Sequence, residues 1–445
     1  MSTSHSKKAK TFLKDTAYAD WHDRTFWSVR EKRDKMAVSL DEWEQLREKA
    51  SAIKRHTLTH LDEYLERFAS QAQKNGAIVH WAADAAGFNE IVYDILSSHG
   101  VRKMVKSKSM LTEECEMNPY LEARGIEVVE TDLGERIIQL KGQKPSHIVM
   151  PAIHLSHDEV GELFEEKGIS DEKGNHDPAY LTYRARLSLR NEFLTAQAGM
   201  TGANFGIAAT GDIVVCTNEG NADMSTSCPK LQISAIGLEK VIPDYDCLAV
   251  FQRMLCRAGT GQPTTTYTSH FRKARCPEGE MHIILVDNGR SEWLSNPEHW
   301  ETLKCIRCGS CMNTCPVYRR SGGYSYSYFI PGPIGINLGM LRSPREHAGN
   351  LSACTLCKSC QSVCPVKIEL GDQIYSWRQS LPGIGAENRT KKQLSEAMSF
   401  VFGRKGVYKT ASAAARILNL LPPSSLPFRL RFPREPFHTT IKKKK

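Results

Sequence analysis

The chain has 445 residues, of which 40% are hydrophobic and 24% are charged, and it contains 14 cysteines. This composition is typical of a folded globular protein, and the length predicts two or three domains. No stretch approaches the roughly 18 consecutive apolar residues of a membrane-spanning helix. No apolar segment follows the basic N-terminus, as one would in a secretory signal peptide. We therefore expect a cytoplasmic protein.

The net charge of +9 is concentrated at the C-terminal end. Residues 403–445 contain eleven Lys or Arg and one acidic residue, Glu435, so the rest of the chain is close to neutral. No nucleic-acid-binding motif is recognisable in this basic segment, and we expect no nucleic-acid partner. The segment is either a solvated tail or a binding element for an anionic membrane surface, where each Lys contributes about 1 kcal/mol. In the second case the protein is peripheral to the inner face of the membrane.

Residues 1–76 are predicted to be helical, because apolar residues from Leu40 to Phe68 recur at helical spacing. This segment either packs as a structural layer or binds a partner. From residue 77 onward, short apolar strands alternate with amphipathic helices, which predicts an α/β domain with a mostly parallel sheet. The expected strands are 77–81, 103–105, 126–129 and 147–151, and the expected helices are 86–98, 117–123 and 156–166.

Polar residues follow the carboxyl ends of these strands, where ligands bind in parallel sheets. Each has an ordinary structural explanation: Lys106 and Lys108 as solvated side chains, Asp132 as a turn cap and His154 as a half-buried histidine. Their shared location also allows a ligand site. In that case Lys106, Lys108 and His154 are candidate catalytic residues that hold a carboxylate and accept a proton.

Residues 199–211 are rich in glycine and precede a predicted strand at 212–216, and another strand is expected at 281–286. The glycines match neither the G-x-G-x-x-G nor the P-loop pattern, so we do not expect a dinucleotide site. They are better explained by tight turns and close backbone approach. A helix is expected to start at Asn296 and to run into Cys305.

Two cysteine runs between Cys305 and Pro365 have the same spacing, C-x2-C-x2-C-x3-C-P. In bacterial two-cluster proteins, the first three thiolates of such a run bind one [4Fe-4S] cluster and the fourth binds the other. A single C-x-x-C would favour zinc, whereas two complete runs, each closed by proline, favour two [4Fe-4S] clusters over zinc or disulfides. The predicted ligand sets are Cys305, Cys308, Cys311 and Cys364 for one cluster, and Cys354, Cys357, Cys360 and Cys315 for the other.

The other six cysteines have no pairing pattern and are expected to be reduced thiols, with Cys216 and Cys228 as small buried side chains. An aromatic insert, residues 318–335, separates the two runs and either packs over a cluster or docks a partner. A helical stretch is expected at 391–421, followed by the basic, proline-rich end.

The chain resembles the lactate-utilisation iron–sulfur protein B family over nearly its whole length. The resemblance is carried by both cysteine runs and by five further segments, namely residues 106–113, 128–135, 145–154, 201–205 and 217–221. It implies an LUD domain of the sugar-isomerase/CoA-transferase-like α/β type, followed by an α-helical, bacterial-ferredoxin-like two-cluster domain. The boundaries we expect are 1–76 for the helical segment, 77–290 for the LUD domain, 291–380 for the two-cluster domain and 381–445 for the C-terminal helix and tail.

The resemblance also implies a role in oxidising L-lactate to pyruvate, with a cysteine-rich redox subunit and a second, cluster-free LUD subunit as partners. The chain departs from the family at two positions, Gln197 and Ala209, where the family usually has acidic residues. If either acid acted as a general acid or base, this subunit has lost it.

Three functions are consistent with the sequence. The first is an electron-transfer subunit of a lactate-oxidising complex, itself either non-catalytic or co-catalytic. The second is a self-sufficient 2-hydroxy-acid oxidoreductase with its substrate in the LUD domain. The third is a regulatory iron–sulfur protein. The family resemblance and the absence of a flavin or nicotinamide pattern favour the first.

Overall fold

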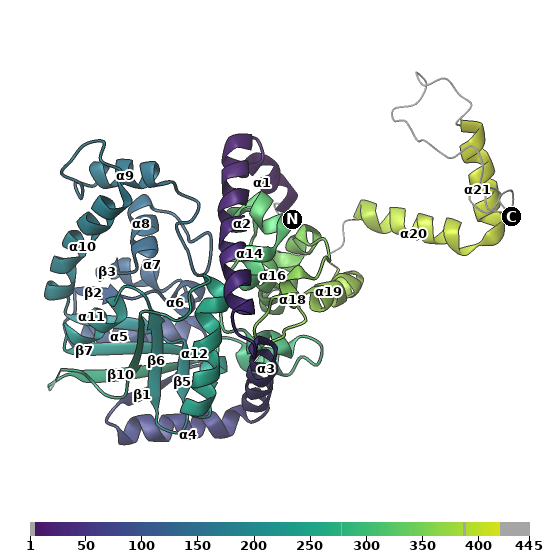
Figure 1. Cartoon of the computed structure of the whole chain (residues 1–445). Coiled ribbons are helices and arrows are strands. Elements are labelled where there is room, and N and C mark those ends of the chain that lie inside the picture. The colour runs from purple at the N-terminus through teal and green to yellow at the C-terminus, as the bar shows by residue number, and fades with distance from the viewer. Residues whose placement is uncertain (1–4, 277, 386–388, 419–445) are drawn as a thin grey trace. The chain divides into compact units, whose positions relative to one another are not determined.

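The computed structural model describes residues 5–276, 278–385 and 389–418. Its internal contacts divide the chain into two compact units, residues 1–380 and 381–445 (Figure 1). All 14 cysteines belong to the first unit.

The centre of the first unit is a six-stranded sheet in which all neighbouring strands are parallel, in the order β1-β10-β7-β4-β2-β3. Both of its faces are covered, and β7 is accordingly buried at every position. This sheet confirms the predicted α/β class. Its strands are β1 (Ile78–Ala82), β2 (Lys103–Lys106), β3 (Glu127–Glu130), β4 (Ala198–Gly202), β7 (Leu231–Gly237) and β10 (Glu280–Val286).

One face of this sheet is covered by three helices. Phe88 and Val92 lie in a core with Met104, Ile233 and Ile284 of the sheet. Successive residues of a strand point to opposite faces, so Val105, next to Met104, belongs to another core. The covering helices are α5 (Ala85–Ser98), α6 (Met110–Glu114) and α7 (Met117–Glu122).

The opposite face packs against helix α4 (Leu61–Lys74), helix α10 (Pro178–Thr195) and a second sheet. Phe68 of α4 lies in a core with Ile283 of β10 and Ile213 of the second sheet. That sheet has the order β8-β5-β6-β9. Its strands are β5 (Phe205–Ile207), β6 (Asp212–Thr217), β8 (Val241–Ile242) and β9 (Tyr267–Phe271).

Several helices of this domain begin at an Asp or Ser whose side chain accepts a hydrogen bond from the first turn, as N-caps do. Ser156, the first residue of the helix predicted at 156–166, caps α9 in a reciprocal capping box with Glu159. The capped helices include α5, α8 (Leu133–Lys141), α9 (His157–Glu166), α10 and α12 (Tyr245–Gly259).

The N-terminal helices pack as a structural layer on the cysteine-rich module. Arg33 Nη2 donates to the carbonyl oxygen of Val363 at 3.1 Å, and His22 Nδ1 lies 2.7 Å from that of Arg319. Figure 1 shows α2 alongside α14 of that module. These helices are α1 (His5–Phe12), α2 (Thr16–Val38) and α3 (Trp43–Thr59).

The cysteine-rich module is built from short helices joined by the two cysteine loops. Its α-helices are α13 (Arg290–Leu294), α14 (Ser310–Thr314), α15 (Pro316–Ser321), α16 (Gly332–Arg342), α17 (Pro344–His347), α18 (Ser359–Ser362) and α19 (Leu370–Ile384). Single 3-10 turns occur at Trp300–Lys304, Gly323–Ser325 and Ala348–Ala353.

The predicted strand at 147–151 is wrong, because this segment forms bends and a turn. The His147 ring is the cause: its Nδ1 accepts hydrogen bonds from the backbone N–H groups of Val149 and Met150, which a strand would direct to a neighbouring strand. The sequence pattern also missed β7 and the helices α8, α10, α11 (Asn221–Ser227) and α12. The helix expected from Asn296 is only the short 3-10 turn before Cys305.

The second unit contains α20 (Arg389–Gly403) and α21 (Lys405–Leu418) where one helical stretch was expected. The proline-rich, basic segment at 419–445 lies outside the described residues. No helix in the described part of the chain is long and apolar enough to cross a membrane.

Candidate functional site

The two cysteine loops bend in the same way at equivalent positions. Arg307 (φ 62°) and Gly309 (φ 81°) are left-handed in the first loop, and Leu356 (φ 57°) and Lys358 (φ 58°) are left-handed in the second. Residues other than glycine rarely adopt this conformation. Its recurrence at three such residues indicates that the loop shape serves a site.

The bent loops direct backbone N–H groups toward sulfur atoms. Hydrogen bonds of this kind favour the thiolate form and influence the reduction potential of a bound cluster. The first and fourth cysteine of each run receive one. The bonds run from Arg307 N to Cys305 Sγ (3.4 Å), Tyr318 N to Cys315 Sγ (3.5 Å), Leu356 N to Cys354 Sγ (3.3 Å) and Ile368 N to Cys364 Sγ (3.4 Å).

The first group of thiols combines the start of the first run with the end of the second. Burial, together with the nearby Cys364 and Cys305, raises the pKa of Cys308 to about 12. Burial also raises the pKa of Cys311 well above its usual range, again with contributions from Cys305, Cys308 and Cys364. These four thiols are therefore electrostatic neighbours.

The second group of thiols combines the start of the second run with the end of the first. Burial, with smaller contributions from Cys354 and Cys357, raises the pKa of Cys315 to about 11. Burial together with Cys315, Cys354 and Cys357 likewise raises the pKa of Cys360. A small cavity is lined by these four cysteines and by Tyr326.

Both groups fit [4Fe-4S] clusters. Each gathers four thiols that repel one another as thiolates, and bound iron relieves this repulsion. The exchange of the fourth cysteine between runs is the arrangement typical of two-cluster ferredoxins. The groups lie close together, since Cys360 of the second also raises the pKa of Cys311 in the first. Of the eight thiols, Cys357 is the exposed one.

The other six cysteines lie outside both groups. Cys115 and Cys256 are buried, Cys216, Cys247 and Cys276 are half-buried, and Cys228 is exposed. The expectation that Cys228 is a buried side chain is therefore wrong, because it is the residue that ends α11 at the surface.

A larger cavity, of about 350 Å³, lies beyond the carboxyl ends of β2, β4 and β7. Ser107, Gly202 and Gly237 come from these strand ends, while Leu255 of α12 lines another wall. Cys308 of the first cysteine group also lines it. The ligand position expected for a parallel sheet therefore adjoins one of the cysteine groups.

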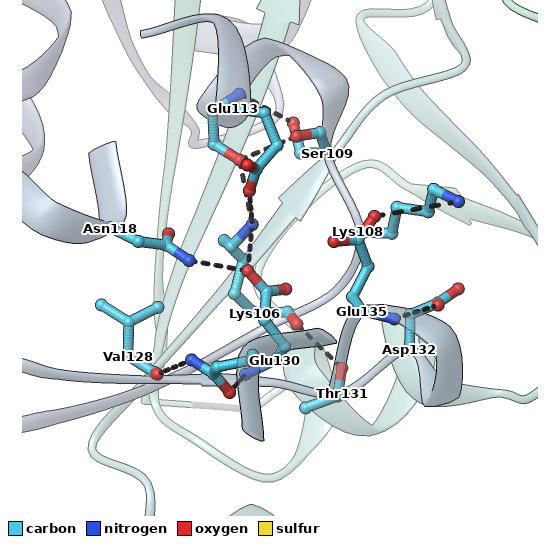
Figure 2. Close-up of polar contacts among 12 residues, drawn as sticks. Lys106, Lys108, Ser109, Glu113, Asn118, Val128, Glu130, Thr131, Asp132 and Glu135 are labelled. Carbon is cyan, nitrogen blue, oxygen red and sulfur yellow. Dashed lines mark hydrogen bonds and ion pairs between the residues drawn. The ribbon is translucent and has the colours of Figure 1, made fainter. Parts of the chain in front are cut away.

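The residues predicted at the strand ends separate into two environments. Lys108 and Asp132 line the cavity, whereas Lys106 does not. Figure 2 shows Lys106 directed toward Glu130 and Glu113, away from Lys108. Its Nζ lies 2.7 Å from Glu130 Oε1 and 3.7 Å from Glu113 Oε1, and its side chain is buried, so it forms an internal ion pair.

Glu113, Glu130 and Glu135 bring carboxylate oxygens within 4.8 Å of one another, the spacing of a metal site. Here the Lys106 ammonium supplies the positive charge between Glu113 and Glu130. Burial raises the pKa of Glu135 to about 8, although Lys108 lies 3.9 Å away. Because Glu135 is mostly protonated at neutral pH, it adds little to the negative charge that Lys106 and Lys108 balance.

His154 lies outside the larger cavity and holds the aromatic insert in place. Its Nδ1 lies 2.7 Å from Ser146 Oγ and its Nε2 3.1 Å from the Tyr324 hydroxyl. Tyr318 donates to the carbonyl oxygen of Ser146 at 2.6 Å. Burial lowers the pKa of His154 to about 4, so its ring is neutral at pH 7. The insert thus packs inside the molecule, and Tyr326 covers the second cysteine group.

Several charged cavity residues were not singled out from the sequence: Glu114, Glu219, Glu239, Lys240, Arg290 and Arg307. Two of these residues could have been found from the sequence: Arg307 lies inside the first cysteine run, and Glu219 belongs to one of the segments that resemble the family. The others belong to no motif.

The two departures from the family pattern lie away from the cavity. Gln197 is at the amino end of β4, where its Oε1 accepts a hydrogen bond from Arg102 N at 2.6 Å. Ala209 lies in the turn between β5 and β6. Neither lines the cavity, so the loss of an acid there leaves the cavity chemistry intact.

Comparison with known families gives two matches. Residues 65–287 match the LUD domain, and residues 301–368 match the 4Fe-4S dicluster domain. The first match covers β1–β10 and most of the residues that line the large cavity, and the second covers both cysteine runs.

Curated relatives match over most of the chain. Lactate utilization protein B of Macrococcus caseolyticus is 42% identical over 75% of this chain and 70% of its own length. The protein of the same name from Oceanobacillus iheyensis is 43% identical over 69% of this chain and 65% of its own length. An uncharacterized electron transport protein, YkgF, of Escherichia coli is 37% identical over 86% and 81%.

A crystal structure of a duf162 family protein from Deinococcus radiodurans covers 51% of this chain and 98% of its own, with 14% identity and a TM-score of 0.29. A score this low does not establish a shared fold.

Proposed function

Because the chain belongs to the lactate utilization protein B family, we propose that it is the iron–sulfur electron-transfer subunit of a complex that oxidises L-lactate to pyruvate. The proposed cofactors are two [4Fe-4S] clusters, and the grouping of the eight thiols supports this. Their proposed ligands are Cys305, Cys308, Cys311 and Cys364 for the first cluster, and Cys315, Cys354, Cys357 and Cys360 for the second.

The main support for the proposal is that the first thiol group borders the large cavity and the second reaches the surface. Cys308 lines the large cavity, while Cys357 of the second group is exposed. Bound [4Fe-4S] clusters supply one-electron oxidation and reduction. The chain itself buries three of the eight thiols and half-buries four. It supplies four N–H donors to them and leaves one thiol exposed, where a partner can approach.

The proposed partners are a cysteine-rich redox subunit and a second LUD subunit without clusters, as the family resemblance implies. We place the complex in the cytoplasm. If the basic C-terminal segment binds anionic lipid, the complex lies at the inner face of the membrane.

The test uses the full-length chain, reconstituted with iron and sulfide under anaerobic conditions, with L-lactate as donor and D-lactate as control. We expect L-lactate to produce the EPR signal of reduced clusters only when the partner subunits are present. Reduction by the chain alone would instead support a self-sufficient oxidoreductase. A regulatory protein would show no reduction in either case, but air-induced cluster loss would change its partner binding.

A further inference from the structure

Helix α1 packs on the cysteine module through one of its faces. Its residues His5, Ala9 and Phe12 are buried or half-buried, whereas the residues between them are exposed. His5 Nε2 lies 3.2 Å from Ser321 Oγ, and the Phe12 ring packs edge-on against the ring of His22. The inward residues recur at steps of three and four, the spacing of one helix face. The other face of α1 is therefore open to solvent.

This outer face of α1 is basic. The helix contains no acidic residue, and its exposed side chains include Lys7, Lys8 and Lys10, followed by the exposed Lys14 just beyond its end. We call these four residues the α1 lysines. None of them forms an ion pair with another residue that the structure describes. Unpaired like charges at such short spacing repel one another, and a negatively charged surface relieves this repulsion.

The elements beneath α1 do not balance its charge. The helix contacts α15 and the 3-10 turns at Gly323–Ser325 and Ala348–Ala353, and neither turn contains a charged residue. The two arginines of α15 pair with aspartates of α2. Asp15, the cap of α2, is the nearest acidic residue along the chain. The thiolates of the second group are negative as well, although bound iron offsets part of their charge.

Helix α1 also lies next to the second thiol group. Tyr326 lines the small cavity of that group, and the ring of His5 lies 4.8 Å from the ring of Tyr326. The turn at Ala348–Ala353, which α1 contacts, leads directly into Cys354. Cys357 of the same group is exposed. A protein that docks on the α1 lysines thus comes close to the thiol group that reaches the surface.

We propose that the α1 lysines dock an acidic redox protein, which exchanges electrons with the second cluster through the surface at Cys357. One electron at a time passes between this cluster and the partner's own cofactor, so no bond forms or breaks. Opposite charges on two surfaces accelerate their encounter by about 10- to 1,000-fold and fix their orientation. The thiolates alone would repel an acidic partner, and the α1 lysines overcome that repulsion. The electron transfer rests on the proposed function, whereas the docking does not.

The test measures how fast the reconstituted full-length chain gives electrons to plastocyanin, an acidic blue-copper protein. The chain is first reduced with dithionite, which is then removed, and the copper absorbance is followed by stopped flow under anaerobic conditions. We expect the second-order rate constant to fall as salt is raised, because salt screens the attraction. Cytochrome c, a basic protein, is the comparison, and its rate constant should not fall with salt.

Two variants with the same net charge locate the docking surface. The α1 variant reverses the charge of three α1 lysines: Lys7→Glu, Lys8→Glu and Lys10→Glu. The matched control makes the same change at three exposed lysines of the LUD domain: Lys74→Glu, Lys173→Glu and Lys273→Glu. At low salt, the rate constant for plastocyanin should fall at least about tenfold further in the α1 variant than in the control.

A milder variant removes the charge without reversing it: Lys7→Gln, Lys8→Gln and Lys10→Gln. Its rate constant should lie between those of the parent and the α1 variant. Circular dichroism and iron content should be equal in all of these proteins, so that a slower reaction reports docking and not a change of fold.

Three results would overturn the proposal: equal losses in the α1 variant and the control, a plastocyanin rate constant that ignores salt, or a cytochrome c rate constant that falls with salt as steeply. Loss of binding to anionic phosphatidylglycerol vesicles in the α1 variant, with an unchanged plastocyanin rate constant, would also overturn it and assign the α1 lysines to a membrane. Iron content and EPR of the parent test the second cluster separately. If that cluster is absent, titration calorimetry of plastocyanin with the same variants still decides the docking.

Discussion

Cys315 and Cys364 each follow three cysteines of their own run but lie among the thiols of the other run. The following proline and the short helix after Cys315 turn the chain away from its own loop. This exchange ties the two loops together, so a change at either residue is expected to act on the distant group.

Cys315→Ser should remove the cluster held by Cys354, Cys357 and Cys360 and largely spare the other. Iron per chain should fall from about eight to about four, as the arithmetic of two four-iron clusters requires. Iron analysis and EPR of anaerobically reconstituted protein measure this, with the exposed Cys228→Ser as the matched control that keeps about eight. Loss of only the cluster at Cys305, Cys308 and Cys311 would contradict the exchange of ligands.

Glu135→Gln should change how stability depends on pH. The usual pKa of a glutamic acid is about 4.3, and in the folded chain that of Glu135 is raised to about 8. Between these values the folded state holds a proton that the unfolded state releases, so stability falls as pH rises through this window. One such proton contributes a slope of at most about 1.4 kcal/mol per pH unit.

The variant should therefore lose less stability than the parent between pH 5 and pH 8. Urea unfolding at several pH values gives the comparison, and Glu162→Gln, on the exposed side of α9, is the control. Parallel pH profiles for parent and Glu135→Gln would mean that Glu135 is ionised in the folded protein.

At the scale of elements, the aromatic insert and the N-terminal helix α2 form hydrogen bonds to parts of the chain that are distant in sequence. The insert donates from Tyr318 to Ser146, while α2 donates from Arg33 to Val363 and from Tyr18 to the carbonyl oxygen of His154. Both fasten the cysteine module to the LUD domain.

Helices α20 and α21 present another kind of surface. Leu394, Met398 and Phe402 are 61%, 48% and 62% exposed and follow one another at four-residue steps along α20. Exposed basic residues, Lys405 and Lys409, follow this stripe in the sequence, in α21. An apolar stripe flanked by basic residues suits an anionic membrane interface.

Deleting residues 386–445 should therefore weaken binding to anionic phosphatidylglycerol vesicles and leave the iron content unchanged, because all cluster cysteines belong to the first unit. Deleting only residues 433–445 removes five of the eleven basic residues of the segment 403–445 but keeps the apolar stripe, and it should lower mainly the salt-sensitive part of the binding. Co-sedimentation at low and high salt measures both. Loss of iron in either truncation, or equal vesicle binding by all three proteins, would rule out this role.

At the scale of the whole molecule, residues 1–380 form one compact unit although they match two domain families. Lys54 of α3 donates to the carbonyl oxygen of Glu239 in the LUD domain, and Lys304 of the cysteine module donates to Ser51 of α3 at 2.8 Å. Separating the parts would leave buried charged groups unpaired, which is strongly unfavourable.

We therefore expect the reconstituted chain to unfold in one transition. Far-ultraviolet circular dichroism and visible cluster absorbance, followed together in urea under anaerobic conditions, should give coincident curves. A chain truncated after Ser380 is the control, and its two unfolding curves should also coincide. If absorbance were lost well before the circular dichroism changed, the cysteine module would be unfolding independently of the LUD domain.

The sequence by itself predicted the features that depend on local spacing. Two runs of four cysteines predicted two ligand sets, because residues two or three positions apart necessarily lie close together. Short apolar runs predicted β1, β2 and β3, and the helix predicted at 156–166 matches α9 with its cap at Ser156, since strand pattern and capping are local properties. It failed at residues 147–151, where the pattern was apolar but the His147 side chain took the backbone hydrogen bonds.

Only the tertiary structure decided which residues meet. Lys106 and Lys108 are two positions apart, and a continuous strand would point both to the same side. Strand β2 ends at Lys106, however, so Lys106 is buried against Glu130 while Lys108, beyond the strand, reaches the cavity. Ser107, Thr217 and Arg307 are about one hundred residues apart and share a wall because the cysteine loop packs on the strand ends. Such proximity depends on how the whole chain packs, and no local pattern records it.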